Sequence, residues 1–188
     1  MSPNRYFIKG PDFTLNAVFP TGNWQPVTLS SYAAAGRATV LVFYPLDFSP
    51  TCSNHVPAFS RLAADFDDLG ADVLCVSRDS VYTHRAWSRE LGLQVPLLSD
   101  MTLSAAQLYG ADCPERGQTY RATFVIGADG KIRFAHREED STELTLSAEQ
   151  LLTALPGLLS GLQARRAPSH HRPWFFFTLC CSDVTHPA

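Results

Sequence analysis

The chain has 188 residues, of which 45% are hydrophobic, and it carries a formal net charge of −3 at pH 7. This length and this hydrophobic content suit one globular domain with a sizeable core, and they exclude an intrinsically disordered chain. The mild acidity without a basic stripe argues against nucleic acid as a partner, and no apolar run approaches the length that spans a membrane.

The predicted elements alternate between strands and helices along the chain. In order they are a hairpin over 13–18 and 27–29, a helical turn over 30–36, a strand over 39–44, a helix over 56–69, a strand over 71–77, a helix over 80–91, a short apolar stretch over 95–98, a helix over 103–109, a hairpin over 122–127 and 131–135, and a helix over 147–162. This order predicts an α/β sheet that is covered by helices on both faces.

The composition changes after Gln163. Residues 164–173 are basic, contain proline and lack any periodicity, whereas 174–181 are strongly apolar but too short to cross a membrane. We therefore expect one domain over residues 1–163 and a basic and aromatic tail over 164–188, with the apolar part docked on its own domain or on a partner subunit.

The five cysteines form an odd set without the regular spacing of a disulfide scaffold. No Cys-x-x-Cys pair occurs, so no metal site is predicted. The first ten residues lack the apolar segment of a secretory signal. The expected location is therefore cytoplasmic, in a reducing compartment where one or two thiols work.

Cys52 lies between the apolar run 38–44 and the amphipathic stretch 56–69. This position places its thiol at a helix N-terminus. Unpaired backbone N–H groups and the helix dipole favour the thiolate there, and the thiolate is the form that attacks electrophiles. Cys52 is the candidate nucleophile, and we expect it in a partly exposed, electropositive setting. Cys75, inside an apolar strand, is expected to be an inert core residue.

The spacing Pro45-x-x-x-Ser49-x-x-Cys52 resembles the active-site signature Pro-x-x-x-Thr/Ser-x-x-Cys of the peroxiredoxin family. The resemblance extends through 10–13, 80–87 and 120–126, in family order, over about five-sixths of the chain. It is strongest to the branch of alkyl hydroperoxide reductase C and thiol-specific antioxidant. It implies a thioredoxin-like fold with a central mixed sheet flanked by helices and a peroxiredoxin-type N-terminal hairpin.

The resemblance also implies a thiol-dependent peroxidase that reduces hydrogen peroxide and organic hydroperoxides without metal, haem or flavin. Cys52 would attack the peroxide and become a sulfenic acid. The Ser49 hydroxyl would accept from the peroxide and donate to the thiolate, and Pro45 would shield the sulfur. Arg121 corresponds to the family's active-site arginine and would stabilise the thiolate.

Four further residues are secondary candidates for the pocket. The family places aromatic residues such as Tyr44, Phe48 and Trp87 around its active site and dimer contacts, although each could be an ordinary packing residue. His55 stands where many relatives carry glutamate. It would raise the thiolate content when protonated, exchange hydrogen bonds in the pocket, or be a solvated spectator, and the spectator is the expectation.

The thiol that resolves the sulfenic acid stays open. The candidates are Cys180 and Cys181 in the tail, Cys113 on a polar loop, or an external thiol in a one-cysteine cycle. The resemblance implies a thioredoxin-like or other thiol reductant and a homodimer or larger homo-oligomer. The alternative functions are a redox-sensing or chaperone-like interaction protein and a thioredoxin-type disulfide oxidoreductase, which should carry a cysteine at position 49.

Overall fold

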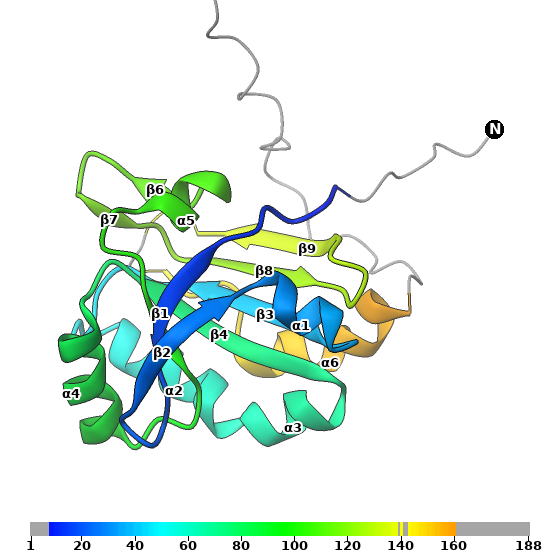
Figure 1. Ribbon diagram of the computed structural model, residues 1–188, viewed down its shortest axis with the longest axis horizontal. Coiled ribbons are helices and arrows are strands. Elements are labelled where there is room, and N and C mark those ends of the chain that lie inside the picture. Colours follow the sequence, from blue (N-terminus) through cyan, green and yellow to red (C-terminus); the bar gives the residue numbers. More distant parts are fainter. Residues whose placement is uncertain (1–7, 139, 141–142, 161–188) are drawn as a thin grey trace, which may run out of the picture.

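The computed structural model describes residues 8–138, 140 and 143–160. Seven strands form one mixed sheet, and they are β1 (Thr14–Val18), β2 (Trp24–Thr28), β3 (Ala38–Phe43), β4 (Ala71–Ser77), β5 (Leu97–Ser99), β8 (Ala122–Ile126) and β9 (Ile132–Arg137). Their order across the sheet is β2-β1-β5-β4-β3-β8-β9, with β3, β4 and β5 parallel and the remaining neighbours antiparallel (Figure 1). The predicted α/β class with a mixed central sheet is confirmed.

The helices are α1 (Ser30–Ala34), α2 (Cys52–Arg61), α3 (Ala63–Asp68), α4 (Val81–Leu91), α5 (Ser104–Leu108) and α6 (Ala148–Leu159). Among the residues that the structure describes, no helix combines the length and apolarity needed to cross a membrane.

Two apolar clusters lie on opposite faces of the sheet. Alternate residues of β3 enter different clusters: Val40 and Val42 pack with side chains of α2, α4 and α6, whereas Leu41 and Phe43 pack with side chains of α1 and α5. A strand that is buried on both faces needs apolar residues at every position. This double burial explains the continuous apolar runs at 38–44 and 71–77.

Local signals set the ends of the two longest helices. The Ser80 side chain caps α4 by accepting a hydrogen bond from the Thr83 backbone N–H, and Gly92 ends that helix in the left-handed conformation. At α6, Ser147 and Gln150 form a reciprocal capping box. The predicted starts of both helices are thereby confirmed to within a residue.

Two predicted segments differ from the structure. The helix expected over 56–69 begins at Cys52 instead and is interrupted at Leu62, whose ψ of 8° breaks the helical hydrogen-bond pattern. The polar loop expected around Cys113 contains a small hairpin of β6 (Asp112–Cys113) and β7 (Gln118–Thr119). Gly117, with φ of 58°, permits the tight turn between them.

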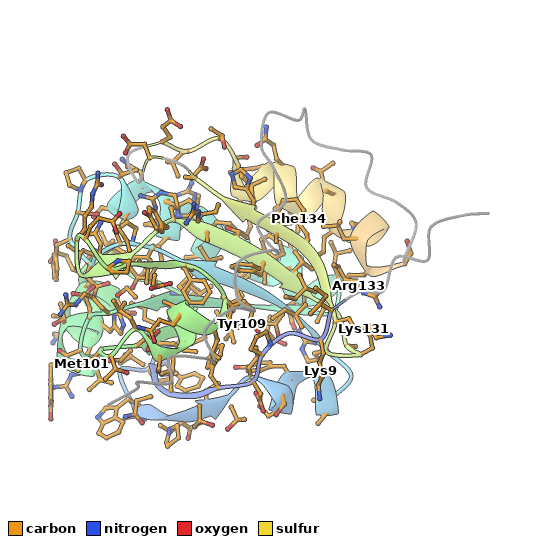
Figure 2. All side chains as sticks on the ribbon, turned by 90° about the horizontal axis from the view of Figure 1, so that it is seen from above. Lys9, Met101, Tyr109, Lys131, Arg133 and Phe134 are labelled. Carbon is orange, nitrogen blue, oxygen red and sulfur yellow. The ribbon has the colours of Figure 1, made fainter. Side chains whose placement is uncertain are left out.

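Tertiary contacts hold two segments that lie outside the seven-stranded sheet against it. The Thr119 hydroxyl donates to the Tyr44 carbonyl at 2.6 Å, which fixes the β6–β7 hairpin over the end of β3. A β-bridge joins Lys9 to Lys131, and Figure 2 shows these two residues at the same corner of the molecule. The predicted tail over 164–188, with Cys180 and Cys181, lies outside the described residues.

The attachment of α2 to the sheet can be tested at Phe59, which is fully buried and stacks on Phe66. We expect Phe59→Ala to lower the free energy of unfolding by about 3–5 kcal/mol, because it leaves a cavity between helix and sheet. Arg61→Ala, at an exposed position of the same helix, should change it by no more than about 0.5 kcal/mol. Urea denaturation measures both, and equal effects would contradict the packing described.

Candidate functional site

Cys52 is the first residue of α2, so its sulfur lies at the positive end of a ten-residue helix. The helix lays the face formed by Cys52, His55, Val56 and Phe59 against the sheet, with the spacing of an amphipathic helix. The expectation of a partly exposed sulfur is wrong, because Cys52 is 0% exposed. The reason is that its position in the helical repeat places it on the buried face.

Arg121 brings a permanent positive charge to this sulfur. The antiparallel pairing of β3 with β8 sets Phe43 opposite Ala122, so the residue before β8 lies at the end of β3 where the segment leading to α2 begins. Arg121 is 2% exposed, and its Nη2 donates to Cys52 Sγ at 3.6 Å. A cation at this distance favours the thiolate over the neutral thiol.

His55 is part of the same contact. Its Nδ1 lies 3.0 Å from Arg121 Nη1, and its ring meets Phe59 edge-on with centroids 5.2 Å apart. The side chain is buried, so the expectation of a solvated spectator is wrong. Burial, and then the charge of Arg121, lower the pKa of His55 to about 3, with Glu138 opposing the shift. The imidazole is therefore neutral at neutral pH and adds no charge to the site.

The loop between β3 and α2 holds Pro45, which is buried, and Ser49, which is half-buried. The Ser49 carbonyl accepts a hydrogen bond from the Ser53 N–H at 2.9 Å, which ties this residue to the first turn of α2. Between them, Phe48 has a φ of 59°, a left-handed conformation that is uncommon for a large side chain. Such a conformation persists only where neighbouring contacts impose it.

Asp47, the residue before Phe48, forms a buried hydrogen-bonded network with His84, and neither residue was among the predicted site residues. The Asp47 carboxylate accepts from Tyr44 Oη at 2.7 Å and lies 2.8 Å from His84 Nδ1, while the Asp47 N–H donates to Asp79 Oδ2 at 2.9 Å. His84 Nε2 lies 3.2 Å from the Leu98 carbonyl oxygen. One sequence signal was present: His84 shares the buried face of α4 with Trp87 and Ser88, an unusual place for an imidazole without a partner.

The three aromatic candidates form one cluster beside this loop. Tyr44 stacks on Trp87 with ring centroids 5.5 Å apart, and the Phe48 and Trp87 ring centroids lie 6.3 Å apart. Tyr44 and Trp87 are buried, whereas Phe48 is 49% exposed. The structure thus brings together residues that are far apart in the sequence, with two in the core and one at the surface.

The other cysteines differ in environment. Cys75 is fully buried on β4, and burial raises the pKa of its thiol, which agrees with the predicted core role. Cys113 is buried on β6, where its Sγ donates to Glu115 Oε1 at 3.0 Å. Burial, and then this hydrogen bond, raise the pKa of Cys113 and keep its thiol protonated. Within the described part of the chain, no three His, Cys, Asp or Glu side chains are grouped as metal ligands.

Comparisons with known proteins identify the family of the chain. The AhpC/TSA family matches residues 9–135. Mouse peroxiredoxin-2 is 45% identical over 130 residues, which cover 65% of this chain and 64% of the mouse protein. The chloroplastic 2-Cys peroxiredoxin BAS1 of barley is 35% identical over 157 residues, which cover 80% of this chain and 73% of the barley protein. The chain thus spans just under two thirds of the length of the mouse relative.

Solved structures give the same result for the fold. The reduced 2-Cys peroxiredoxin of Plasmodium vivax superposes with a TM-score of 0.74 at 25% identity and covers 80% of this chain and 93% of its own. The AhpC of Enterococcus faecalis superposes with a TM-score of 0.75 at 26% identity and covers 86% and 98%. These superpositions confirm the predicted thioredoxin-like fold. The family match spans well over half of the sequence, and the chain therefore belongs to the AhpC/TSA family of peroxiredoxins.

Proposed function

We propose that this chain is a thiol-dependent peroxidase that reduces hydrogen peroxide and organic hydroperoxides through Cys52. The observation that carries the proposal is the contact of 3.6 Å between Arg121 Nη2 and Cys52 Sγ at the N-terminus of α2. A sulfur with two sources of positive potential is poised to ionise, and only the thiolate attacks an O–O bond efficiently.

In the proposed step, the thiolate of Cys52 attacks one oxygen of the hydroperoxide. A new S–O bond forms as the O–O bond breaks, and the departing oxygen takes up a proton to leave as water or an alcohol. The sulfur is oxidised to a sulfenic acid and the peroxide is reduced. Arg121 is the residue that would stabilise negative charge on the departing oxygen.

Substrate access requires a local opening, because Cys52 is 0% exposed. The loop that carries Pro45 and Ser49 leads directly into α2, and Ser49 is only half-buried. In the proposed complex the Ser49 hydroxyl accepts from the peroxide and Pro45 keeps water from the sulfur. A small hydroperoxide needs a smaller opening than a bulky one does.

The sulfenic acid must then be reduced by a second thiol, which releases water and leaves a disulfide. The protonated state of Cys113 and the burial of Cys75 argue against both as the resolving group. We therefore propose resolution by Cys180 or Cys181 of the tail, or by an external thiol. A thioredoxin-like dithiol would return the disulfide to the reduced state.

The proposed setting is antioxidant defence in the cytoplasm, with the chain assembled as a homodimer or larger homo-oligomer. Leu46 and Tyr82 are exposed apolar residues near the active-site loop and α4, as is Phe48, and they are candidates for a subunit contact. The thioredoxin-type oxidoreductase has less support, because position 49 is serine.

The role of Cys52 can be tested with Cys52→Ser, which should abolish peroxide consumption because the hydroxyl group is a far weaker nucleophile. Stopped-flow mixing with hydrogen peroxide measures the rate. Cys75→Ser is the matched control and should keep most of the activity. Full turnover by the Cys52 variant would contradict the assignment.

The role of Arg121 can be tested by ultraviolet titration of the Cys52 thiolate. In Arg121→Ala we expect the thiolate absorbance to appear only at higher pH, since a cation beside the sulfur is lost. Arg121→Lys should move it less, because a charge remains at the site. An unchanged titration in the alanine variant, with the fold intact by circular dichroism, would refute the pairing.

The resolving step can be followed by intact mass and peptide mapping after one equivalent of peroxide. We expect either a disulfide between Cys52 and Cys180 or Cys181, or a persistent sulfenic acid on Cys52. The first outcome identifies the tail thiol, and the second supports an external thiol. A disulfide between Cys52 and Cys113 is the result that this structure argues against.

A further inference from the structure

We propose that His55 is a positioning residue that holds the guanidinium of Arg121 beside Cys52 by means of an uncharged hydrogen-bond acceptor. The inference deepens the proposed function and rests on it, because the placement of Arg121 matters only if Cys52 reacts as a thiolate. Two observations carry it: the geometry of the contact and the burial of both partners.

The geometry fixes which partner donates. Arg121 Nη1 lies 3.0 Å from His55 Nδ1, and a guanidinium has N–H donors but no acceptor. Nδ1 must therefore be the acceptor, so the proton of the neutral ring sits on Nε2. The second terminal nitrogen of the same guanidinium, Nη2, donates to Cys52 Sγ at 3.6 Å. One planar group thus bridges the imidazole and the sulfur.

Burial keeps this arrangement uncharged on the histidine side. His55 is 5% exposed and Arg121 is 2% exposed. The charged or titratable groups around the imidazole are Arg121 before β8, Glu138 after β9 and Cys52 on its own helix. Burial and the guanidinium charge lower the pKa of His55, and the carboxylate of Glu138 opposes them with the smaller effect. The ring accepts the hydrogen bond at neutral pH because it carries no proton on Nδ1.

The neutrality of the imidazole matters for the positive charge that Arg121 presents to Cys52. A carboxylate at position 55 would also accept from Arg121, but it would place a negative charge against the guanidinium and partly cancel the field at the sulfur. The imidazole orients Arg121 without that cancellation. The positive charge that Arg121 presents to Cys52, and to the departing oxygen of the peroxide, is then undiminished by this contact.

Three substitutions separate orientation from charge. His55→Asn places an amide oxygen the same number of bonds from the backbone as Nδ1, so it keeps a neutral acceptor. His55→Asp has nearly the same shape but adds a negative charge. His55→Leu removes the acceptor and keeps an apolar side chain on the buried face of α2.

The readouts are the ultraviolet titration of the Cys52 thiolate, with Cys52→Ser as the blank, and the second-order rate with hydrogen peroxide. We expect His55→Asn to stay close to the parent protein in both. His55→Asp should move the titration to higher pH than His55→Asn does, because an opposite charge faces Arg121. His55→Leu should lower the rate by roughly 10–100-fold, which is the factor that one hydrogen bond to a charged group is worth.

Two results would overturn the proposal: a leucine variant that reacts like the parent, or an aspartate variant that titrates like the asparagine variant. Circular dichroism checks the fold of each, and if the leucine variant does not fold, the Asn–Asp pair still decides the question. The titration needs no peroxide and no reductant. A wrong role for His55 would therefore show in the titrations of the variants. A wrong peroxidase assignment would show in the parent protein, which would then not consume peroxide.

Acid unfolding gives an independent check. The folded pKa of His55 is about 3, well below the value near 6.5 in an unfolded chain. Between these values the unfolded state binds the extra proton, so the parent protein should lose stability as the pH falls. His55→Asn removes this site and should show a shallower fall of the melting temperature over the same range. Identical pH profiles would contradict a neutral, buried imidazole at this position.

Discussion

The arrangement of this protein depends on one buried cation, the guanidinium of Arg121, which lies between the sulfur of Cys52 and the ring of His55. Burying a permanent charge is costly unless its donors find partners. Here the Cys52 sulfur and the His55 imidazole accept from it, and in the proposed function this charge stabilises a thiolate at Cys52. Low local dielectric strengthens this attraction beyond its value at the surface.

The contrast between two buried cysteines shows how far the environment decides reactivity. Cys52 and Cys75 are both 0% exposed and belong to the same apolar cluster. Cys75 lies within a strand, and burial raises the pKa of its thiol. Cys52 has a helix N-terminus and a guanidinium beside it. Burial by itself therefore makes a cysteine inert, and burial together with a fixed positive charge makes it a candidate nucleophile.

A second network holds the loop in front of the sulfur. The Asp47 carboxylate joins this loop to Tyr44 and to His84 on α4, and the Asp47 backbone N–H joins it to the Asp79 carboxylate. These bonds offset the cost of the left-handed Phe48, which is of the order of 1–2 kcal/mol for a side chain of this kind. These hydrogen bonds therefore hold the loop that carries Pro45 and Ser49 on its inner side, while Phe48 stays at the surface.

The sequence determined the elements, because periodicity, capping residues and turn residues are local. The strand over 71–77 has the predicted bounds, whereas the helix expected from residue 56 begins at Cys52. The sequence could not show which residues His55 and Asp47 contact. His55 meets Arg121 across 66 positions and Asp47 meets His84 across 37, and such contacts depend on the order of the strands. Only the tertiary structure decided which polar groups are buried and which charges lie beside them. Burial and the neighbouring charges in turn set the protonation state of each group.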